Sequence, residues 1–181
     1  GEIIDDALLT AVQESRQFGQ GFATSEYLAA AIIDLAWHSL TPEQAAQVGE
    51  DADAVRAFED AALAEAGLTV DELAPRYRST YFNHIFGGGY SAGYYSYLWA
   101  EALDADGFDW FTEQPDVRAA GEKFRDLILS RGASLDYGDA FRELRGRDKD
   151  VAPLLRRRGL LVHMCWTGLS SPRRCAVSTP C

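Results

Sequence analysis

Residues 79–99 read STYFNHIFGGGYSAGYYSYLW, with three consecutive glycines (87–89) between a histidine and a row of tyrosines. Because successive glycines weaken a helix or a strand, they indicate a sharp bend or a close approach of the backbone. The residues that follow predict a helix over 92–105, capped by Ser91 and ending before Gly107. The stretch therefore predicts a glycine-rich loop followed by a helix that carries tyrosines.

The helix predicted over 92–105 has two faces of different character. One face follows the three-and-four spacing of residues that pack inward, and it consists of Tyr95, Leu98 and Ala102. The other carries phenol and carboxyl groups, and it consists of Tyr94, Tyr97, Glu101 and Asp104, with Tyr90 one turn earlier. Phenols are neutral donors near pH 7 and can point at an oxygen that becomes negative during a reaction. Aromatic residues at this spacing more often pack in a core, so the spacing alone leaves both interpretations open.

Helical patterns dominate the rest of the chain, and no segment of any length alternates as a strand would. Longer helices are predicted over 5–17, 25–38, 116–131 and 137–145, and shorter ones begin at Pro42 and after Asp150. Residues 25–38, with Ser25 as the cap, are apolar nearly all round, so this helix is expected to be buried. The predicted class is therefore all-α.

The composition fits one core of ordinary size, since the chain has 181 residues of which 47% are hydrophobic. No apolar run is long enough to predict a membrane span. The formal net charge of -11 argues against nucleic acid as a partner, which requires basic patches. The acidic residues are interpreted as a solvated surface, as at Asp51, Asp53, Glu59 and Asp60.

The two ends of the chain differ from its body. The start, GEIIDDALL, has neither an initiator methionine nor a signal-peptide pattern, so the chain is expected to be a piece of a longer protein. Residues 161–181 contain all three cysteines, Cys165, Cys175 and Cys181, at no metal-knuckle spacing, and a body without cysteine favours the cytoplasm. We interpret 161–181 as an unmatched, disordered tail rather than a small metal or redox element, and 1–160 as the folded part.

Residues 1–160 also resemble a known family as one collinear match. The resemblance is carried by Tyr-Phe-x-His-Ile-Phe-Gly-Gly-Gly-Tyr-x-Ala-Gly-Tyr-Tyr-x-Tyr-Leu-Trp, and further by segments at 17–22, 35–38, 75–78, 106–111, 128–132 and 145–146. These segments are similar to the C-terminal part of the catalytic domain in the thimet-oligopeptidase family of zinc metallopeptidases, and within it to the bacterial peptidyl-dipeptidases. The resemblance implies the helical portion of a zincin-type domain, and zinc-dependent release of dipeptides from the C-termini of short peptides in the cytoplasm.

The resemblance also implies that the zinc site is not in this chain. In the family, Zn²⁺ is held by a His-Glu-x-x-His helix and a later glutamate, the metal activates water, and the motif glutamate is the general base. These ligands precede the stretch matched here. This sequence has no such motif, and its three histidines, His38, His84 and His163, lie far apart. The missing N-terminal part of the same enzyme is thus the implied partner, the chain supplies no metal ligand, and the isolated chain is expected to be inactive.

Site roles follow from the same resemblance, residue by residue. Tyr97 and Tyr90 correspond to the family's tyrosines that stabilise the oxyanion of the tetrahedral intermediate, and His84 to a loop histidine that hydrogen-bonds the substrate backbone. Tyr94 has the place of a tyrosine that holds the substrate's terminal carboxylate in the more distant angiotensin-converting enzyme. The hinge that lets the loop close over substrate corresponds to Gly87, Gly88 and Gly89. His38 is interpreted as structural.

An alternative of a different class is a non-catalytic helical fragment that has no activity because it lacks the zinc site. The two hypotheses differ in one feature, which is an upstream His-Glu-x-x-His in the same reading frame or on a partner chain.

Overall fold

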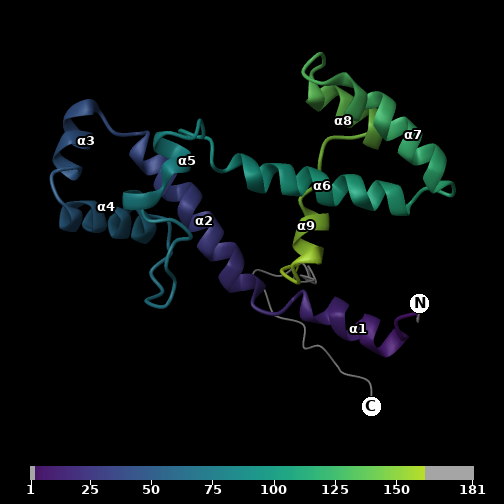
Figure 1. The fold of residues 1–181 in the computed structure, drawn as a ribbon, viewed down its shortest axis with the longest axis horizontal. Coiled ribbons are helices and arrows are strands. Elements are labelled where there is room, and N and C mark those ends of the chain that lie inside the picture. The colour runs from purple at the N-terminus through teal and green to yellow at the C-terminus, as the bar shows by residue number, and fades with distance from the viewer. Residues whose placement is uncertain (1–2, 162–181) are drawn as a thin grey trace, which may run out of the picture.

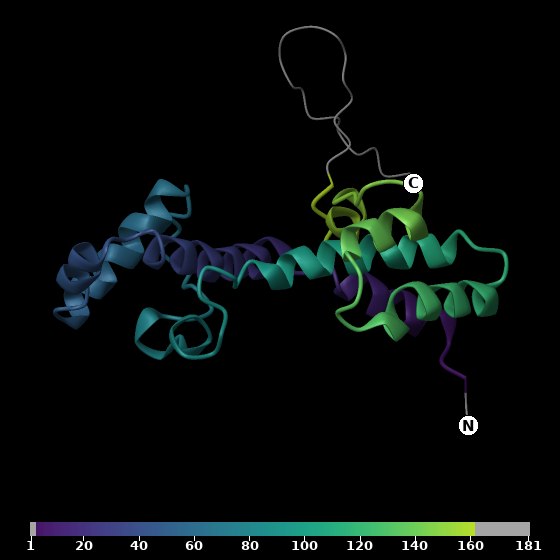
Figure 2. The same cartoon turned by 90° about the horizontal axis from the view of Figure 1, so that it is seen from above.

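The computed structural model describes residues 3–161, and over this range it contains helices and turns but no strand, which confirms the all-α prediction. In Figures 1 and 2, α3 and α4 lie at one end of the molecule and α7 and α8 at the other, with α2 and α6 as the long helices. None of the helices described is long and apolar enough to cross a membrane. The elements in chain order are α1 (Asp6–Ser15), α2 (Gln20–Trp37), α3 (Pro42–Val48), α4 (Ala52–Glu65), η1 (Ser79–Tyr81), α5 (Asn83–Phe86), α6 (Ser96–Thr112), α7 (Val117–Leu127), η2 (Leu129–Arg131), α8 (Tyr137–Arg145) and α9 (Ala152–Arg157).

Helix α2 forms the centre of the first half of the fold. It begins after Gly19, whose φ of 69° is left-handed, and so Ser25 is a residue inside the helix and not its cap as predicted. Small side chains let neighbouring segments approach α2 closely, and the buried ones are Ala29, Ala30 and Ala31. On one side they pack with Leu63 of α4, and on the other with Phe82 and Ile85 beside the glycine loop. The burial predicted for this helix is confirmed for its middle, but Leu35 is 44% exposed.

Helix α6 is longer than predicted and begins later. It starts at Ser96, and Ser91 donates its hydroxyl hydrogen to the Ile85 carbonyl at 2.6 Å instead of capping the helix. It continues through Gly107 and does not end before it. Gly107 is buried together with its neighbours Asp106 and Trp110. A glycine inside a helix costs about 1 kcal/mol, which the packing of these neighbours offsets.

The predicted faces of this helix were partly wrong. Ala102 is buried as expected, but Tyr95 is 49% exposed and Tyr94 is only 3% exposed. Both tyrosines precede the first residue of α6, so helical spacing does not govern the direction of their side chains.

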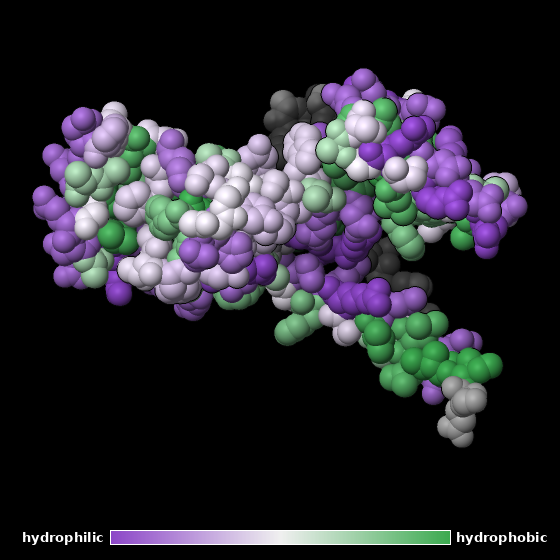
Figure 3. All heavy atoms as spheres, turned by 45° about the horizontal axis from the view of Figure 1, so that its top comes forward, coloured by the Kyte–Doolittle hydropathy of each residue, from purple (hydrophilic) through white to green (hydrophobic). Residues whose placement is uncertain are grey.

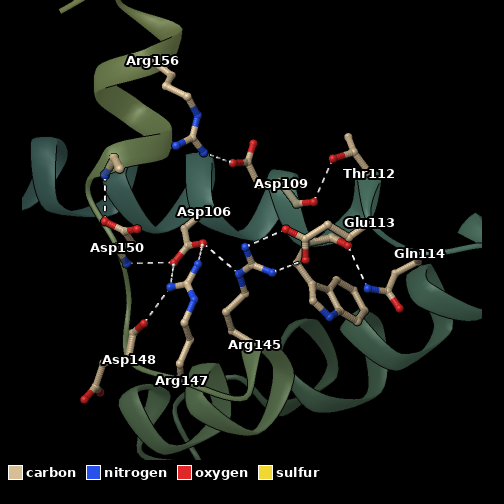
Figure 4. Close-up of polar contacts among 12 residues, drawn as sticks. Asp106, Asp109, Thr112, Glu113, Gln114, Arg145, Arg147, Asp148, Asp150 and Arg156 are labelled. Atoms are coloured by element: carbon tan, nitrogen blue, oxygen red, sulfur yellow. Dashed lines mark hydrogen bonds and ion pairs between the residues drawn. The ribbon is translucent and has the colours of Figure 1, made fainter. Parts of the chain in front are cut away.

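A network of ion pairs around Asp106 holds α8 and the segment before α9 against α6 (Figure 4). The Asp106 carboxylate is fully buried and accepts Nε of Arg145 at 2.8 Å and Nη2 of Arg147 at 2.7 Å. It also accepts the backbone N–H of Asp150 at 2.8 Å. Acids on both sides of Asp106 along α6 pair with arginines at the end of α9 and at its C-cap, as Arg156–Asp109, Arg157–Asp104 and Arg158–Glu101.

Helix α1 projects from the rest of the molecule as an arm. It has no buried residue, and Figure 3 shows hydrophobic residues gathered on this arm. Its exposed apolar side chains are Leu8, Leu9 and Val12, with Ile4 just before it. The prediction of a separate tail concerns residues 161–181, of which 162–181 lie outside the described residues.

Candidate functional site

The glycine triplet ends α5 and turns the chain back immediately after His84. The N–H groups of Gly87 and Gly88 both donate to the Asn83 carbonyl, at 2.9 and 2.8 Å. A Cβ on Gly88 would lie 2.9 Å from the His84 Cα, and Gly89 has a φ of +82°. Two of the three glycines are therefore required by geometry, one for close approach and one for left-handed backbone.

A buried carboxylate on α2 fixes the far end of this loop. Asp34 is fully buried, and its two oxygens accept the N–H groups of Ala92 and Tyr94, each at 2.8 Å. Ala92 has a φ of 53°, which is a left-handed conformation that costs a non-glycine residue about 1–2 kcal/mol. His38 lies beside the same carboxylate, with Nδ1 2.9 Å from Asp34 Oδ1. This position agrees with the structural role expected for His38.

A second buried carboxylate fixes the start of the stretch. Glu59 of α4 accepts the Ser79 N–H at 2.6 Å and Nη1 of Arg78 at 2.8 Å. Trp37 donates its indole N–H to the Ser79 hydroxyl at 2.7 Å. The prediction that Glu59 lies on a solvated surface was therefore wrong. This residue is only 2% exposed and forms an ion pair with Arg78.

The four aromatic residues predicted for the site lie together in one cluster. The ring centroids of His84 and Tyr94 are 5.7 Å apart, and those of Tyr94 and Tyr97 are 5.2 Å apart. Tyr90 stacks on Tyr97 at 5.0 Å and lies 6.1 Å from His84. The loop and the start of α6 thus bring the predicted site residues next to one another, although 13 positions separate the first from the last.

The three phenols of the cluster differ in exposure. Tyr97 is 39% exposed, whereas Tyr94 is 3% exposed. Hydrogen bonding with Tyr90 is the largest of the effects that raise the pKa of Tyr97 to about 12, and burial raises the pKa of Tyr94 to about 12. Both phenols therefore keep their protons at neutral pH and can act as hydrogen-bond donors.

The described residues do not form a metal centre. Between residues 3 and 161, no three side chains of His, Cys, Asp or Glu come together in a way that could hold an ion. His84 lies among tyrosine and phenylalanine rings, with Tyr77 at 4.8 Å and Phe82 at 5.8 Å between ring centroids. The family resemblance implies a zinc ion, but the described residues do not provide a group of side chains that could bind it.

Three residues that shape the site were not predicted from the sequence. Asp34 and Glu59 hold the two ends of the loop, and Arg76 stands beside the cluster with its guanidinium 4.8 Å from the Tyr27 ring centroid. The one signal in the sequence was an acidic residue inside the apolar 25–38 helix, since a carboxylate buried there needs partners.

Comparisons with known proteins give a consistent result. The model of the family described as Peptidase family M3 matches residues 1–160. The chain is 42% identical over 161 residues to dipeptidyl carboxypeptidase of Escherichia coli (strain K12), a match that covers 88% of this chain and 23% of that protein. It is 30% identical to saccharolysin of Saccharomyces cerevisiae over 161 residues, or 88% of this chain and 22% of that protein.

A shorter match reaches a second bacterial peptidase. The chain is 49% identical over 80 residues to oligopeptidase A of Escherichia coli, which is 44% of this chain and 12% of that protein. The chain thus spans at most 23% of the length of these relatives.

Proposed function

This chain belongs to peptidase family M3, and from that membership we propose that it forms part of a zinc-dependent peptidase that releases dipeptides from the C-termini of peptides. In this enzyme the chain supplies the loop and helix that hold the substrate and stabilise the oxyanion. The observation that carries the proposal is the convergence of the site residues His84, Tyr90, Tyr94 and Tyr97 in one cluster at the glycine loop.

Tyr97 and Tyr90 are proposed to stabilise the negative oxygen that develops when the scissile carbonyl becomes tetrahedral. A neutral phenol suits this role, because a donor aimed at a developing charge lowers the barrier more than it stabilises the ground state. An ordinary phenol already keeps its proton over the neutral range, and hydrogen bonding with Tyr90 raises the pKa of Tyr97 to about 12. The partial exposure of Tyr97 also lets a substrate oxygen reach the hydroxyl.

The remaining site residues are proposed to hold the peptide. His84 is proposed to hydrogen-bond the substrate backbone, and the glycines 87–89 to let the loop close over it. Tyr94 is proposed to act at the end of the peptide that carries the carboxylate, with its buried ring as the support on which Tyr97 and His84 pack.

The zinc ion is proposed to be held by residues outside the described part of the chain, on the missing N-terminal part of the enzyme. The described residues do not offer a set of ligands that fits the ion. Release of dipeptides is favoured because the match to dipeptidyl carboxypeptidase is 42% identical over 88% of this chain, whereas saccharolysin is 30% identical over the same share and the match to oligopeptidase A covers 44%. The proposed location is the cytoplasm, as cysteine usage indicates.

The alternative is a non-catalytic helical fragment. It differs from the peptidase hypothesis in that no upstream His-Glu-x-x-His would be joined to this chain. Under this hypothesis the aromatic cluster only packs as part of the core and takes part in no reaction.

The test is to sequence the DNA about two kilobases upstream, and then to assay the encoded protein. We expect an in-frame His-Glu-x-x-His, and a complete protein that cleaves a dipeptide from a blocked tripeptide in a chelator-sensitive reaction. The isolated 181-residue chain should bind no stoichiometric zinc and cleave nothing. A stop or frameshift between the motif and this chain would favour the fragment hypothesis.

A further inference from the structure

The buried Asp34 carboxylate, which fixes the far end of the glycine loop, has a side-chain partner besides the backbone of that loop. Between residues 3 and 161 no arginine or lysine pairs with Asp34, and the ionisable side chain that contacts its oxygens is His38. Nδ1 of His38 lies 2.9 Å from Asp34 Oδ1, the same oxygen that accepts the N–H of Ala92. A buried carboxylate is costly unless hydrogen bonds satisfy it, so His38 supports the side chain that holds the loop.

The surroundings of His38 determine which of its ring nitrogens carries a proton. Besides Asp34 Oδ1, Nδ1 lies 2.8 Å from the backbone carbonyl oxygen of Asp34. Both of these oxygens are acceptors, so Nδ1 is the donor in the neutral ring as well as in the charged one. His38 therefore holds one oxygen of Asp34 in place whatever the charge of its own ring.

His38 also lies beside the other end of the loop. Its ring centroid is 6.2 Å from that of Phe86, the last residue of α5, and the two rings are tilted by 36°. Phe86 directly precedes the glycines 87–89, and Asp34 holds the backbone of residues 92 and 94 that follow them. The His38 ring thus stands between the residue that enters the glycine loop and the carboxylate that fixes its exit.

We propose that His38 is a positioning residue for the reaction, which holds the Asp34 carboxylate in the orientation that places Tyr94 and, through its ring, the oxyanion donor Tyr97. This inference rests on the proposed function and deepens it, because it assigns control of the catalytic loop to the C-terminal end of α2. In this role His38 acts through Asp34 and not on the substrate.

The link from Asp34 to the site is short. The N–H of Tyr94 donates to Asp34 Oδ2 at 2.8 Å, and the ring centroid of Tyr94 lies 5.2 Å from that of Tyr97 and 5.7 Å from that of His84. A displacement of about 1 Å in a group that acts on the transition state can lower the rate about 100-fold. Loss of the His38 contact would leave Asp34 freer to rotate, and so would lower the rate through the backbone of the loop.

The left-handed backbone at Ala92 supports the same inference independently. Its φ of 53° is unfavourable for a residue with a Cβ, and the hydrogen bond to Asp34 Oδ1 holds the residue there. Since His38 contacts that same oxygen, its removal should let residue 92 relax away from this conformation. A substitution that removes the strain should therefore make the loop less dependent on His38.

The experiment measures kcat and KM of the complete zinc-loaded protein on a blocked tripeptide. His38→Ala is expected to lower kcat about 10- to 100-fold and to raise KM much less, because the oxyanion exists only in the transition state. His38→Asn should restore most of kcat, since its side-chain NH₂ can take the place of the Nδ1 donor. His38→Gln is the matched comparison, because its NH₂ stands one bond farther from the backbone and should not restore kcat.

Ala92→Gly tests the link from the side of the loop. The loss of kcat caused by His38→Ala should be several-fold smaller in the Ala92→Gly background than in the wild type, because a glycine adopts the left-handed conformation without strain. The control is Ser39→Ala, which removes an exposed hydrogen bond to Leu35 at the same end of α2 and should leave kcat unchanged.

Amide hydrogen exchange of the segment 92–94 provides a readout that does not depend on activity. Exchange there should be faster in His38→Ala and close to the wild-type rate in His38→Asn. Circular dichroism checks folding, and if His38→Ala is unfolded, the comparison of His38→Asn with His38→Gln decides the question.

Four outcomes would overturn the inference: an unchanged kcat in His38→Ala, the same kcat in His38→Asn and His38→Gln, an equal loss with and without Ala92→Gly, or unchanged exchange at 92–94. Faster exchange at 92–94 in a protein without peptidase activity would support the hold of His38 on the loop and contradict the proposed function. An active peptidase in which His38→Ala keeps its full kcat would do the reverse.

Discussion

The carboxylate of Asp34 accepts the backbone N–H of Tyr94 at 2.8 Å and so ties α2 to a turn 60 residues later in the chain. Its other oxygen accepts the N–H of Ala92, which stands in a left-handed conformation. A carboxylate with two accepting oxygens fits two converging N–H donors, and an amide does not.

Asp34→Asn is therefore expected to lower the free energy of unfolding by about 1–3 kcal/mol, since the new NH₂ group would face a backbone donor. Urea titration of the complete protein measures this. The matched control is Asp60→Asn, because Asp60 is a 64% exposed carboxylate on α4, and it should stay within about 0.5 kcal/mol of the wild type. Equal stability of wild type and Asp34→Asn would mean that this buried carboxylate does not hold the loop.

Tyr97→Phe removes only the hydroxyl of the accessible phenol in the cluster. We expect kcat of the complete enzyme to fall about 100- to 1000-fold with little change in KM, because the oxyanion exists only in the transition state. Steady-state kinetics with a blocked tripeptide gives both constants. Tyr95→Phe is the matched control, since Tyr95 is 49% exposed and lines a separate, apolar pocket with Leu98 and Leu154, and it should keep kcat. An unchanged kcat in Tyr97→Phe would exclude Tyr97 from the mechanism.

Gly88→Ala tests the close approach of the loop to α5. The added Cβ would lie 2.9 Å from the His84 Cα and 3.0 Å from its carbonyl oxygen, and these backbone atoms can move only with the helix. We expect a loss of about 1–3 kcal/mol in the free energy of unfolding. Gly121→Ala in α7 meets no heavy atom within 4 Å and should stabilise the protein by about 0.5–1 kcal/mol. A neutral Gly88→Ala would show that the loop has room to move there.

Asp106 should make stability depend on pH in the acid range. Burial would raise the pKa of this carboxyl, but hydrogen bonds from Arg147, the Asp150 N–H and Arg145 lower it below its ordinary 3.8. A depressed pKa in the folded state means that the unfolded chain binds more protons, so this stabilisation is complete above about pH 4 and declines as the pH falls further. Asp106→Asn should lose about 3–5 kcal/mol at pH 7 and show a weaker decline in acid.

Urea unfolding of the Asp106→Asn variant at several values between pH 7 and pH 3 checks this prediction. Asp126→Asn removes an exposed carboxylate that is 65% accessible and serves as the control. The same dependence on pH in wild type and Asp106→Asn would contradict the assignment of the acid-range loss to Asp106.

Much of the local structure was predictable because its causes lie within a few residues. The helix predicted over 137–145 is α8, Tyr137–Arg145, and the start predicted at Pro42 is a capping box between Thr41 and Gln44. The error at Ser91 has a local cause too. The Ser91 hydroxyl donates to the carbonyl of Ile85, six residues earlier. The rules that predict helix caps from sequence do not consider such a partner.

The candidate site divides in the same way. The residue types and their order along 84–97 were visible, and the structure brings these residues together. The roles of Asp34, Glu59 and Arg76 were not visible, because their partners lie 60, 20 and 50 positions away. An acid on a helix is usually solvated, so composition does not identify the buried ones, and only the apolar surroundings of Asp34 gave a signal.

By itself, the sequence determined the all-α class, the glycine-rich turn after His84 and the family to which the chain belongs, since these depend on periodicity, backbone freedom and motif. Only the tertiary structure decided which carboxylates are buried, where α6 begins and which arginine stands beside the aromatic cluster. These features depend on groups that meet only after the chain has folded. A charge removed from water is costly unless another group pairs with it, and the fold decides which group is near enough.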